Sequence, residues 1–131
     1  MWGNISIDKA DSTFSIYVRL RDTKCQKCGR RGTPDREGRP IKGLQCSHFW
    51  GRRNESVRFD PQNCIALCMS CHRYFTENPA EHAQFFLKRL GEKEYDLLQL
   101  RKETYKKKDR KMSLLVAREL LKNMVYEQHL L

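Results

Sequence analysis

Long hydrophobic runs are missing from this 131-residue chain, since polar or charged residues interrupt each apolar stretch before the roughly 20 residues that a membrane-spanning helix needs. The beginning of the sequence also lacks the basic segment followed by an apolar segment that marks a secretory signal peptide. These absences argue against a membrane partner and predict a cytoplasmic protein. Thiols stay reduced in that compartment, so the six cysteines are interpreted first as metal ligands and only second as disulfides.

Apolar residues are scarce in the central part of the chain, between Cys25 and Asp60, where Gly, Arg, Lys, Asp and Gln dominate. A chain of this length can bury only one modest core. Small scaffolds commonly use a metal ion where apolar burial is insufficient. We therefore expect a metal to stabilise this central part.

Acidic residues are in the minority, with 16 Asp and Glu against 26 Lys and Arg and a net charge of +10. A charge of this size favours binding to polyanions and carries no information about the fold. Nucleic acid is therefore the first candidate partner.

Four of the cysteines form two pairs with the same spacing, Cys25-x-x-Cys28 and Cys68-x-x-Cys71. Two residues between thiolates let both sulfurs bind one ion, and two such pairs complete a tetrahedral zinc site. Four thiolates leave no open coordination position, so this zinc would be structural. Two disulfides or a redox CxxC are the alternatives. The remaining Cys46 and Cys64 are interpreted as buried small hydrophobic residues, with a second metal role as the less favoured alternative.

Hydrophobic periodicity predicts an α+β protein. A helix over residues 12–21 can be capped by Asp11 or Ser12, and the turn-rich stretch 25–43 is expected to be a loop. The other expected elements are strands or extended segments at 44–50, 57–60 and 63–67, and helical sequence from 72 onward, with helices at 79–90, 92–106 and 112–128.

Three polar residues are placed informatively around the second cysteine pair. His48 lies near the end of the first predicted strand, Asn63 lies where a loop enters the second strand, and His72 directly follows Cys71. The chain resembles the zinc-stapled form of the HNH endonuclease family in the run Cys25-x-x-Cys28 … Cys46-Ser47-His48-Phe49 … Asn63 … Cys68-x-x-Cys71-His72. The neighbouring pieces 14–22 and 58–63 resemble small phage-encoded members, including the NinG recombination proteins, so the resemblance covers about residues 12–90.

The resemblance implies a ββα-metal core and a role for each matched residue. His48 would be the general base that activates water to attack the scissile phosphate, and Asn63 would hold the loop that carries this histidine. His72 would bind a catalytic divalent ion, such as Mg²⁺ or Mn²⁺. These roles agree with general chemistry, because a neutral histidine accepts a proton near physiological pH and a hard cation offsets phosphate charge.

One position departs from the family pattern. The family often has an acidic residue or a histidine as a metal ligand immediately before the base, and here that residue is Ser47. A serine hydroxyl is a weak ligand, so the catalytic ion would be bound mostly through His72, water and the DNA phosphate. His82 could add a ligand, although a solvent-facing helix histidine is the preferred interpretation.

Three arginines surround the predicted base, namely Arg52, Arg53 and Arg58. The guanidinium group matches phosphate oxygens, so we expect these arginines to contact the DNA backbone. Such contacts position a duplex without reading its sequence. The basic run at 106–111 is interpreted as a solvated junction between helices, with DNA contact as the second choice.

These observations predict three parts: an N-terminal segment with a short helix at 1–24, a zinc-stapled nuclease core at 25–90, and a helical extension at 91–131. The expected function is that of an HNH endonuclease that nicks or cleaves double-stranded DNA with low sequence specificity. The alternatives are a non-catalytic nucleic-acid-binding module and a structure-specific nuclease for branched recombination DNA. The family resemblance adds phage terminase or recombination proteins as candidate partners.

Overall fold

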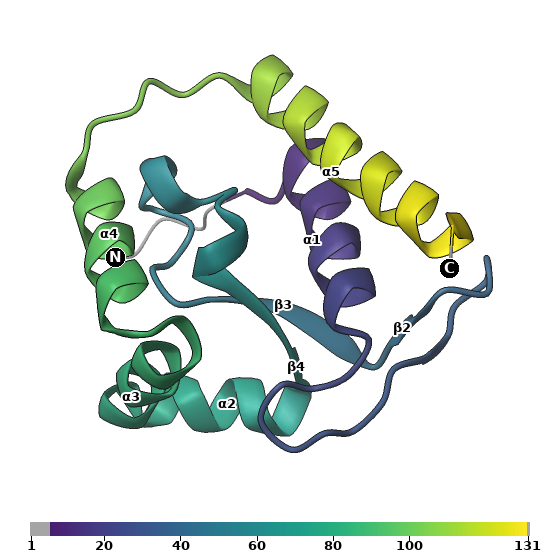
Figure 1. Cartoon of the computed structure of the whole chain (residues 1–131), viewed down its shortest axis with the longest axis horizontal. Coiled ribbons are helices and arrows are strands. Elements are labelled where there is room, and N and C mark those ends of the chain that lie inside the picture. The colour runs from purple at the N-terminus through teal and green to yellow at the C-terminus, as the bar shows by residue number, and fades with distance from the viewer. Residues whose placement is uncertain (1–5, 131) are drawn as a thin grey trace.

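A short antiparallel hairpin lies at the centre of the computed structural model, which describes residues 6–130 (Figure 1). Its strands are β3 (Leu44–His48) and β4 (Cys64–Cys68), and they pair from Leu44 opposite Cys68 to His48 opposite Cys64. The chain is an α+β protein, as predicted. The first strand ends two residues earlier than expected and the second runs one residue further, to Cys68.

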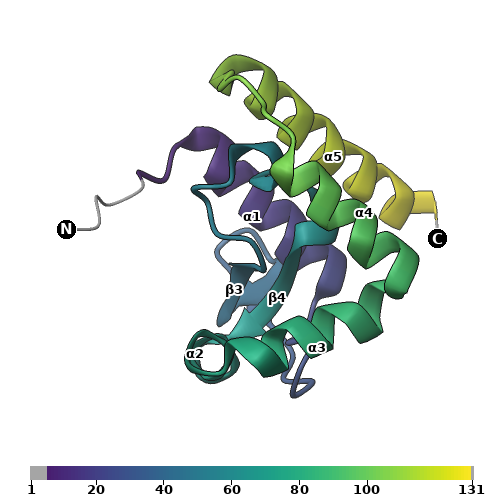
Figure 2. The same cartoon turned by 90° about the vertical axis from the view of Figure 1, so that its left-hand side faces the viewer.

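Helices cover both faces of this hairpin. One face packs on α1 (Lys9–Asp22), and α5 (Arg110–Leu130) lies along the outside of α1. The other face is covered by α2 (Met69–Glu77) and α3 (Pro79–Leu90), as Figure 2 shows. The remaining helix, α4 (Glu92–Glu103), follows α3 and packs against it. In the part of the chain from 6 to 130, no helix is both long and apolar enough to cross a membrane.

Helix α1 begins earlier than the sequence predicted because a different residue caps it. Asp8 is the N-cap, and its side chain accepts a hydrogen bond from the backbone of Asp11, whose own side chain accepts one from Asp8. This reciprocal capping box satisfies two backbone donors that the helix would leave unpaired. Phe14 and Val18, one turn apart, then form the buried stripe that faces the hairpin.

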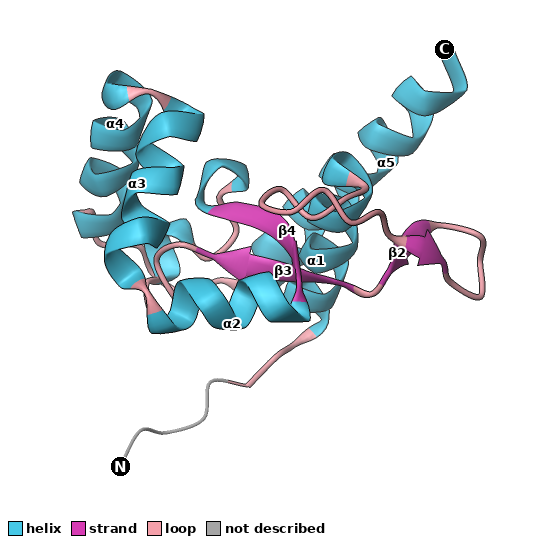
Figure 3. Ribbon diagram, turned by 90° about the horizontal axis from the view of Figure 1, so that it is seen from below, coloured by secondary structure: helices cyan, strands magenta, loops and turns pink. Residues whose placement is uncertain are grey.

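The stretch predicted as a loop contains a second, smaller hairpin of β1 (Thr33–Pro34) and β2 (Pro40–Lys42). Figure 3 shows it at the side of the molecule that lies away from α3 and α4. A Cβ atom at Gly32 would lie 2.2 Å from the carbonyl oxygen of Pro40, so only glycine fits this close approach. Short strands built from turn-forming residues carry little period-two pattern, which explains why no strands were predicted in this stretch.

Other boundaries also differ from expectation: α4 ends at Glu103 instead of 106, and α5 spans Arg110–Leu130 instead of 112–128. Helix α2 begins at Met69 instead of 72, with Cys68 as an extended N-cap, so the second cysteine pair spans the strand–helix junction. The segment expected to be extended at 57–60 instead follows a 3₁₀ turn at Glu55–Val57, and a second such turn at Pro61–Asn63 leads into β4. These turns shape the loop that joins the two strands.

Candidate active site and metal centre

Four cysteine sulfurs converge where the hairpin meets α2. Cys68 ends β4 and Cys71 lies in the first turn of α2, while Cys25 and Cys28 lie in the turn that follows α1. The four Sγ atoms all lie within 4.8 Å of one another. The structure therefore brings together the two pairs that the spacing predicted to share one ion.

The sulfur geometry fits a tetrahedral ion and does not fit disulfides. The Sγ atoms of Cys28 and Cys68 are 3.8 Å apart, whereas a disulfide bond is about 2.05 Å long. Zn–S bonds of about 2.3 Å at tetrahedral angles place two sulfurs about 3.8 Å apart. The cluster is consistent with a structural zinc site.

The protein alone does not ionise all four thiols. Burial opposes ionisation of Cys25, but backbone N–H groups, led by that of Cys28, point at its sulfur and lower the pKa of this thiol to about 6. Burial and then the neighbouring sulfurs raise the pKa of Cys71 to about 12. A full set of four thiolates in this cluster therefore needs a cation.

The two faces of the central hairpin carry different side chains, because successive residues of a strand point to opposite sides. Cys46 and His48 on β3 share a face with Cys64, the cross-strand partner of His48, and α1 covers this face. Gln45 and Ser47 point to the other face, which α2 covers. The residues around the predicted base are thus divided between two sides of one strand.

His48 is held as a neutral base. Its Nε2–H donates to the backbone carbonyl of Arg58 at 2.9 Å, which leaves Nδ1 with a lone pair. Burial, helped by the positive charge of Arg52, lowers the pKa of His48 to about 4. The ring is therefore uncharged at physiological pH and has one nitrogen able to accept a proton.

Asn63 closes the loop that follows His48. Its side chain is fully buried; Oδ1 accepts from the backbone N–H of Trp50 at 2.9 Å, and Nδ2 donates to the carbonyls of Trp50 and Val57 at 2.9 and 3.0 Å. The Asn63 carbonyl also accepts from the backbone N–H of Phe49 at 2.8 Å. These four bonds fix the loop next to the histidine, in the place where the sequence predicted a positioning residue.

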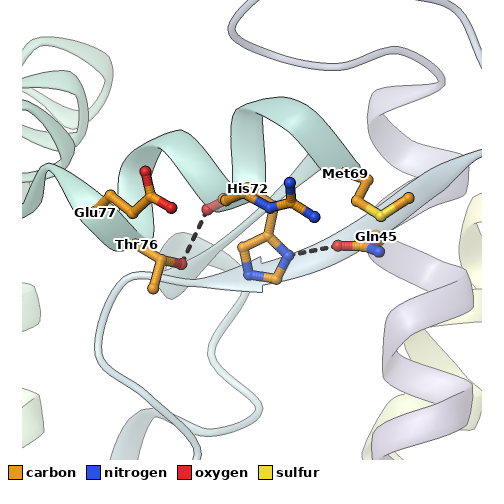
Figure 4. Close-up of a pocket in the computed structure, with 6 residues that line it drawn as sticks. Gln45, Met69, His72, Thr76 and Glu77 are labelled. Carbon is orange, nitrogen blue, oxygen red and sulfur yellow. Dashed lines mark hydrogen bonds between the residues drawn. The ribbon is translucent and has the colours of Figure 1, made fainter.

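His72 projects from α2 into a hollow of about 260 Å³, shown in Figure 4. Its Nδ1 donates to Oε1 of Gln45 at 2.6 Å, which leaves Nε2 as an acceptor. Metal-binding histidines are typically oriented by such a second hydrogen bond. Burial, with a smaller contribution from Arg52, lowers the pKa of His72 and keeps its ring neutral. The hollow is lined by Gln45, Met69, His72, Arg73, Thr76 and Glu77.

Ser47 lies on the same side of β3 as Gln45. It is 1% exposed, and its hydroxyl has no hydrogen-bond partner among the described residues. An unpartnered hydroxyl and the open Nε2 of His72 are donors that a divalent cation can use. The structure therefore places Ser47 and His72 on one face of the hairpin and His48 on the other.

The three predicted DNA-contacting arginines have different environments. Arg58 is 5% exposed, and its guanidinium donates to both carboxylate oxygens of Asp11 at 2.9 and 2.5 Å. This side chain links the loop to α1, and its guanidinium is already paired with a carboxylate. We therefore do not propose that Arg58 contacts DNA.

Arg52 and Arg53 remain at the surface of the loop. The Nε of Arg52 lies 3.7 Å from Asp11, and its charge lowers the pKa of both His48 and His72. Arg53 is exposed and lines a hollow with Lys102 and other residues of the α4 end. Of the predicted DNA contacts, Arg52 is the one whose positive charge lowers the pKa of both His48 and His72.

Two features differ from the interpretation that the sequence favoured. Cys46 and Cys64 are buried, as expected of small hydrophobic residues, but their sulfurs also lie within 4.8 Å of each other and of a ring nitrogen of His48. The alternation of Cys46 and His48 on one strand was visible in the sequence, whereas the register that sets Cys64 opposite His48 was not.

His82 is neither a solvent-facing residue nor a member of a metal-ligand group. Its ring stacks on Phe75, with centroids 4.8 Å apart and planes at 11°, and meets Phe86 edge-on. Burial, followed by repulsion from the His72 ring when that ring is protonated, lowers the pKa of His82 to about 4. The histidine serves as an aromatic side chain between α2 and α3.

Comparison of the chain with protein-family models, with curated proteins and with solved structures found no match.

Proposed function

We propose that the protein is a metal-dependent DNA endonuclease of the HNH class that nicks or cleaves double-stranded DNA with low sequence specificity. The observation that carries this proposal is the state of His48, which is neutral, fixed through Nε2 to a backbone carbonyl and open at Nδ1. The buried Asn63 holds the loop beside it. A neutral histidine with one open ring nitrogen can accept a proton as a general base.

His48 would move the proton in the proposed hydrolysis. Nδ1 of His48 accepts a proton from a water molecule as the water oxygen forms a bond to phosphorus. The bond from phosphorus to the leaving ester oxygen breaks, and that oxygen takes a proton from solvent. His48 then returns its proton to solvent, helped by the burial that disfavours its charged form.

Nε2 of His72 and the hydroxyl of Ser47 are the side-chain atoms that would hold the catalytic ion, with Mg²⁺ or Mn²⁺ as candidates. When bound, such an ion supplies electrostatic stabilisation of the charge that develops on the phosphate oxygens. A hydroxyl is a weaker ligand than the acidic residue or histidine that the family often has at this position. The affinity for the ion is therefore expected to be low, with DNA phosphate completing the ligand set.

Arg52 and Arg53 are proposed to hold the DNA backbone. Both lie on the loop that follows His48, and Lys102 and Lys106 line the same hollow as Arg53. Contacts of this kind fix the duplex without reading bases. They weaken steeply as the salt concentration rises, because the release of counterions from the DNA then yields less free energy. Weak sequence preference and strong salt dependence are the expected properties.

A non-catalytic, zinc-stapled nucleic-acid-binding module is the second candidate function. Two observations favour it: Ser47 replaces a stronger ligand, and His48 lies on the opposite face of the hairpin from His72. The resemblance to phage recombination proteins adds a narrower form of the nuclease proposal, in which branched DNA is the preferred substrate and terminase or recombination proteins are partners.

Plasmid nicking separates the two candidates. Supercoiled plasmid is incubated with the wild type, with His48→Gln and with His82→Phe, a matched control at a histidine outside the site, in Mg²⁺, in Mn²⁺ or without added ion. We expect ion-dependent nicking by the wild type and the control, and at least about a hundredfold slower nicking by His48→Gln, the usual contribution of a general base.

Equal inactivity of all three proteins, with plasmid binding retained on a gel, would assign the chain to the binding module. Branched and linear duplexes of the same sequence test the narrower proposal. Equal cleavage rates on both would remove the preference for branched DNA.

A further inference from the structure

The face of the hairpin that α1 covers carries three donor side chains outside the four-cysteine cluster. Cys46 and His48 are two residues apart on β3, and His48 lies opposite Cys64 on β4. Their side chains point to the same side, and the two sulfurs and one ring nitrogen all lie within 4.8 Å of one another. Cys46 is 7% exposed and Cys64 1%, so both thiols are withdrawn from bulk solvent.

The ring of His48 makes the hydrogen bond to a carbonyl that is typical of a metal-binding histidine. Its Nε2–H is held by the carbonyl of Arg58, and the other nitrogen keeps its lone pair. Histidine ligands commonly donate their second N–H to a carbonyl, because this bond fixes the tautomer and the direction of the ring. Two thiolates and one histidine form a donor set that zinc accepts, with a fourth position left for water.

The surroundings suit a metal centre without net charge. Two thiolates cancel the charge of Zn²⁺, so the assembled centre is compatible with a largely apolar neighbourhood. Phe14 lies beside the His48 ring, with centroids 6.5 Å apart, and Val18 belongs to the same buried cluster as the two cysteines. The adjacent Arg58 and Asp11 neutralise each other in a buried ion pair.

We propose that Cys46, Cys64 and His48 form a second metal site, selective for a thiophilic divalent cation, which binds Zn²⁺ as a second equivalent per chain. Binding releases both thiol protons to solvent and uses a lone pair of His48. One consequence rests on the proposed function: a His48 that binds zinc cannot take a proton from water, so occupancy of this site inhibits the nuclease.

Cobalt titration tests the site itself, without reference to activity. Protein that carries one zinc per chain is titrated with Co²⁺ under reducing, oxygen-free conditions, while released zinc is measured. We expect one further cobalt per chain, thiolate-to-cobalt charge-transfer absorption and no release of zinc. Cys46→Ala and His48→Gln each remove one ligand and should weaken this binding by about tenfold or more, since even outer-shell changes have effects of that size.

His72→Gln is the matched control, because it alters the histidine on the other face and leaves all three proposed ligands in place. Circular dichroism and zinc content confirm that each variant keeps its fold and its first metal. Absence of a second thiolate-bound cobalt in the wild type overturns the proposal, and so does an unchanged titration in both ligand variants.

Nuclease assays in Mg²⁺ with increasing Zn²⁺ test the consequence, each protein being compared with its own zinc-free rate. We expect inhibition of the wild type as the second equivalent binds, and a shift of inhibition to at least about tenfold higher zinc in Cys46→Ala. Zinc inhibition that is identical in both proteins overturns the regulatory role. A protein that binds the second cobalt but never cleaves DNA refutes the nuclease and leaves the metal site standing.

Discussion

The two ends of the β3–β4 hairpin each gather cysteine sulfurs, and the chain builds the two clusters in different ways. At the end where β4 meets α2, two local CxxC turns supply four sulfurs. At the end where His48 faces Cys64, alternate residues of one strand meet a residue of the other. Local spacing made the first cluster visible in the sequence, whereas only the register of the sheet creates the second.

The two ends also differ in what stabilises them. The turn that carries Cys25 and Cys28 packs on the apolar cluster through the buried Cys25, and its sulfurs join those of Cys68 and Cys71, in an arrangement that small scaffolds use to bind a metal. The His48 end is held by protein groups without requiring an ion, namely by the buried amide of Asn63 and the ion pair of Arg58 with Asp11. One end should therefore depend on metal, and the other on hydrogen bonds and charge.

The largest expected effect comes from removing one ligand at the metal-dependent end. Cys68→Ala should lower the free energy of unfolding by more than about 5 kcal/mol, comparable with the whole stability of a small domain, because a structural zinc contributes its binding energy to folding. Thermal unfolding and zinc content measure the effect. Cys46→Ala is the control at the other end and should cost about 1 kcal/mol; equal melting of the two variants would break the comparison.

The next largest effect concerns the ion pair at the protein-stabilised end. Arg58→Met keeps much of the side-chain volume but leaves Asp11 buried and unpaired, which should cost about 3–5 kcal/mol in urea denaturation. Zinc content should stay at the wild-type value. If Arg58→Met loses zinc as well as stability, the two ends of the hairpin are not stabilised independently.

Asn63→Ala should have a smaller but still large effect. The substitution removes one acceptor and two donors and leaves the backbone groups of Trp50 and Val57 without partners, which predicts a loss of about 2–4 kcal/mol. Urea denaturation measures this loss, and plasmid nicking should fall as well, because the loop beside His48 is no longer fixed. A variant that loses stability but nicks at the wild-type rate would contradict the positioning role.

The predictions that succeeded rest on short-range patterns. Two identical spacings placed Cys25, Cys28, Cys68 and Cys71 at one ion, and the structure brings all four together. The apolar period of Phe14 and Val18 correctly indicated α1, although the cap was misplaced by three or four residues, because Asp8, Asp11 and Ser12 are all acceptable caps by residue type.

The features that could not be predicted depend on long-range pairing. Arg58 was expected to face DNA because arginines near a candidate base suit phosphate, but Asp11, 47 residues away in the chain, binds it first. No local pattern encodes that contact. The separation of His48 and His72 onto opposite faces likewise follows from strand alternation combined with the position of α2. The roles assigned to these histidines stay predictions for the plasmid assay.

The smallest expected effect is on the stability of the protein in acid. It concerns histidines that lie at the two ends of the hairpin. His82, packed beside α2, and His48, at the other end, both have a pKa near 4 in the folded protein, below the ordinary value of 6.5. As pH falls below 6.5, these histidines bind protons in the unfolded chain but stay neutral in the folded protein. The stability that they contribute is therefore fully present above pH 6.5 and is lost as pH falls towards 4. Each histidine contributes to this loss.

His82→Phe keeps an aromatic ring against Phe75 and Phe86 and removes one of the histidines whose folded-state pKa is lowered. Between pH 6.5 and 4 the variant should lose about 2 kcal/mol less stability than the wild type, after allowance for the partial exposure of the ring. Acid release of zinc affects both proteins equally and cancels in the difference, so urea denaturation at several pH values isolates the histidine. Parallel stability curves for the two proteins would mean that His82 titrates normally, and would leave the acid sensitivity to His48 and the cysteine end.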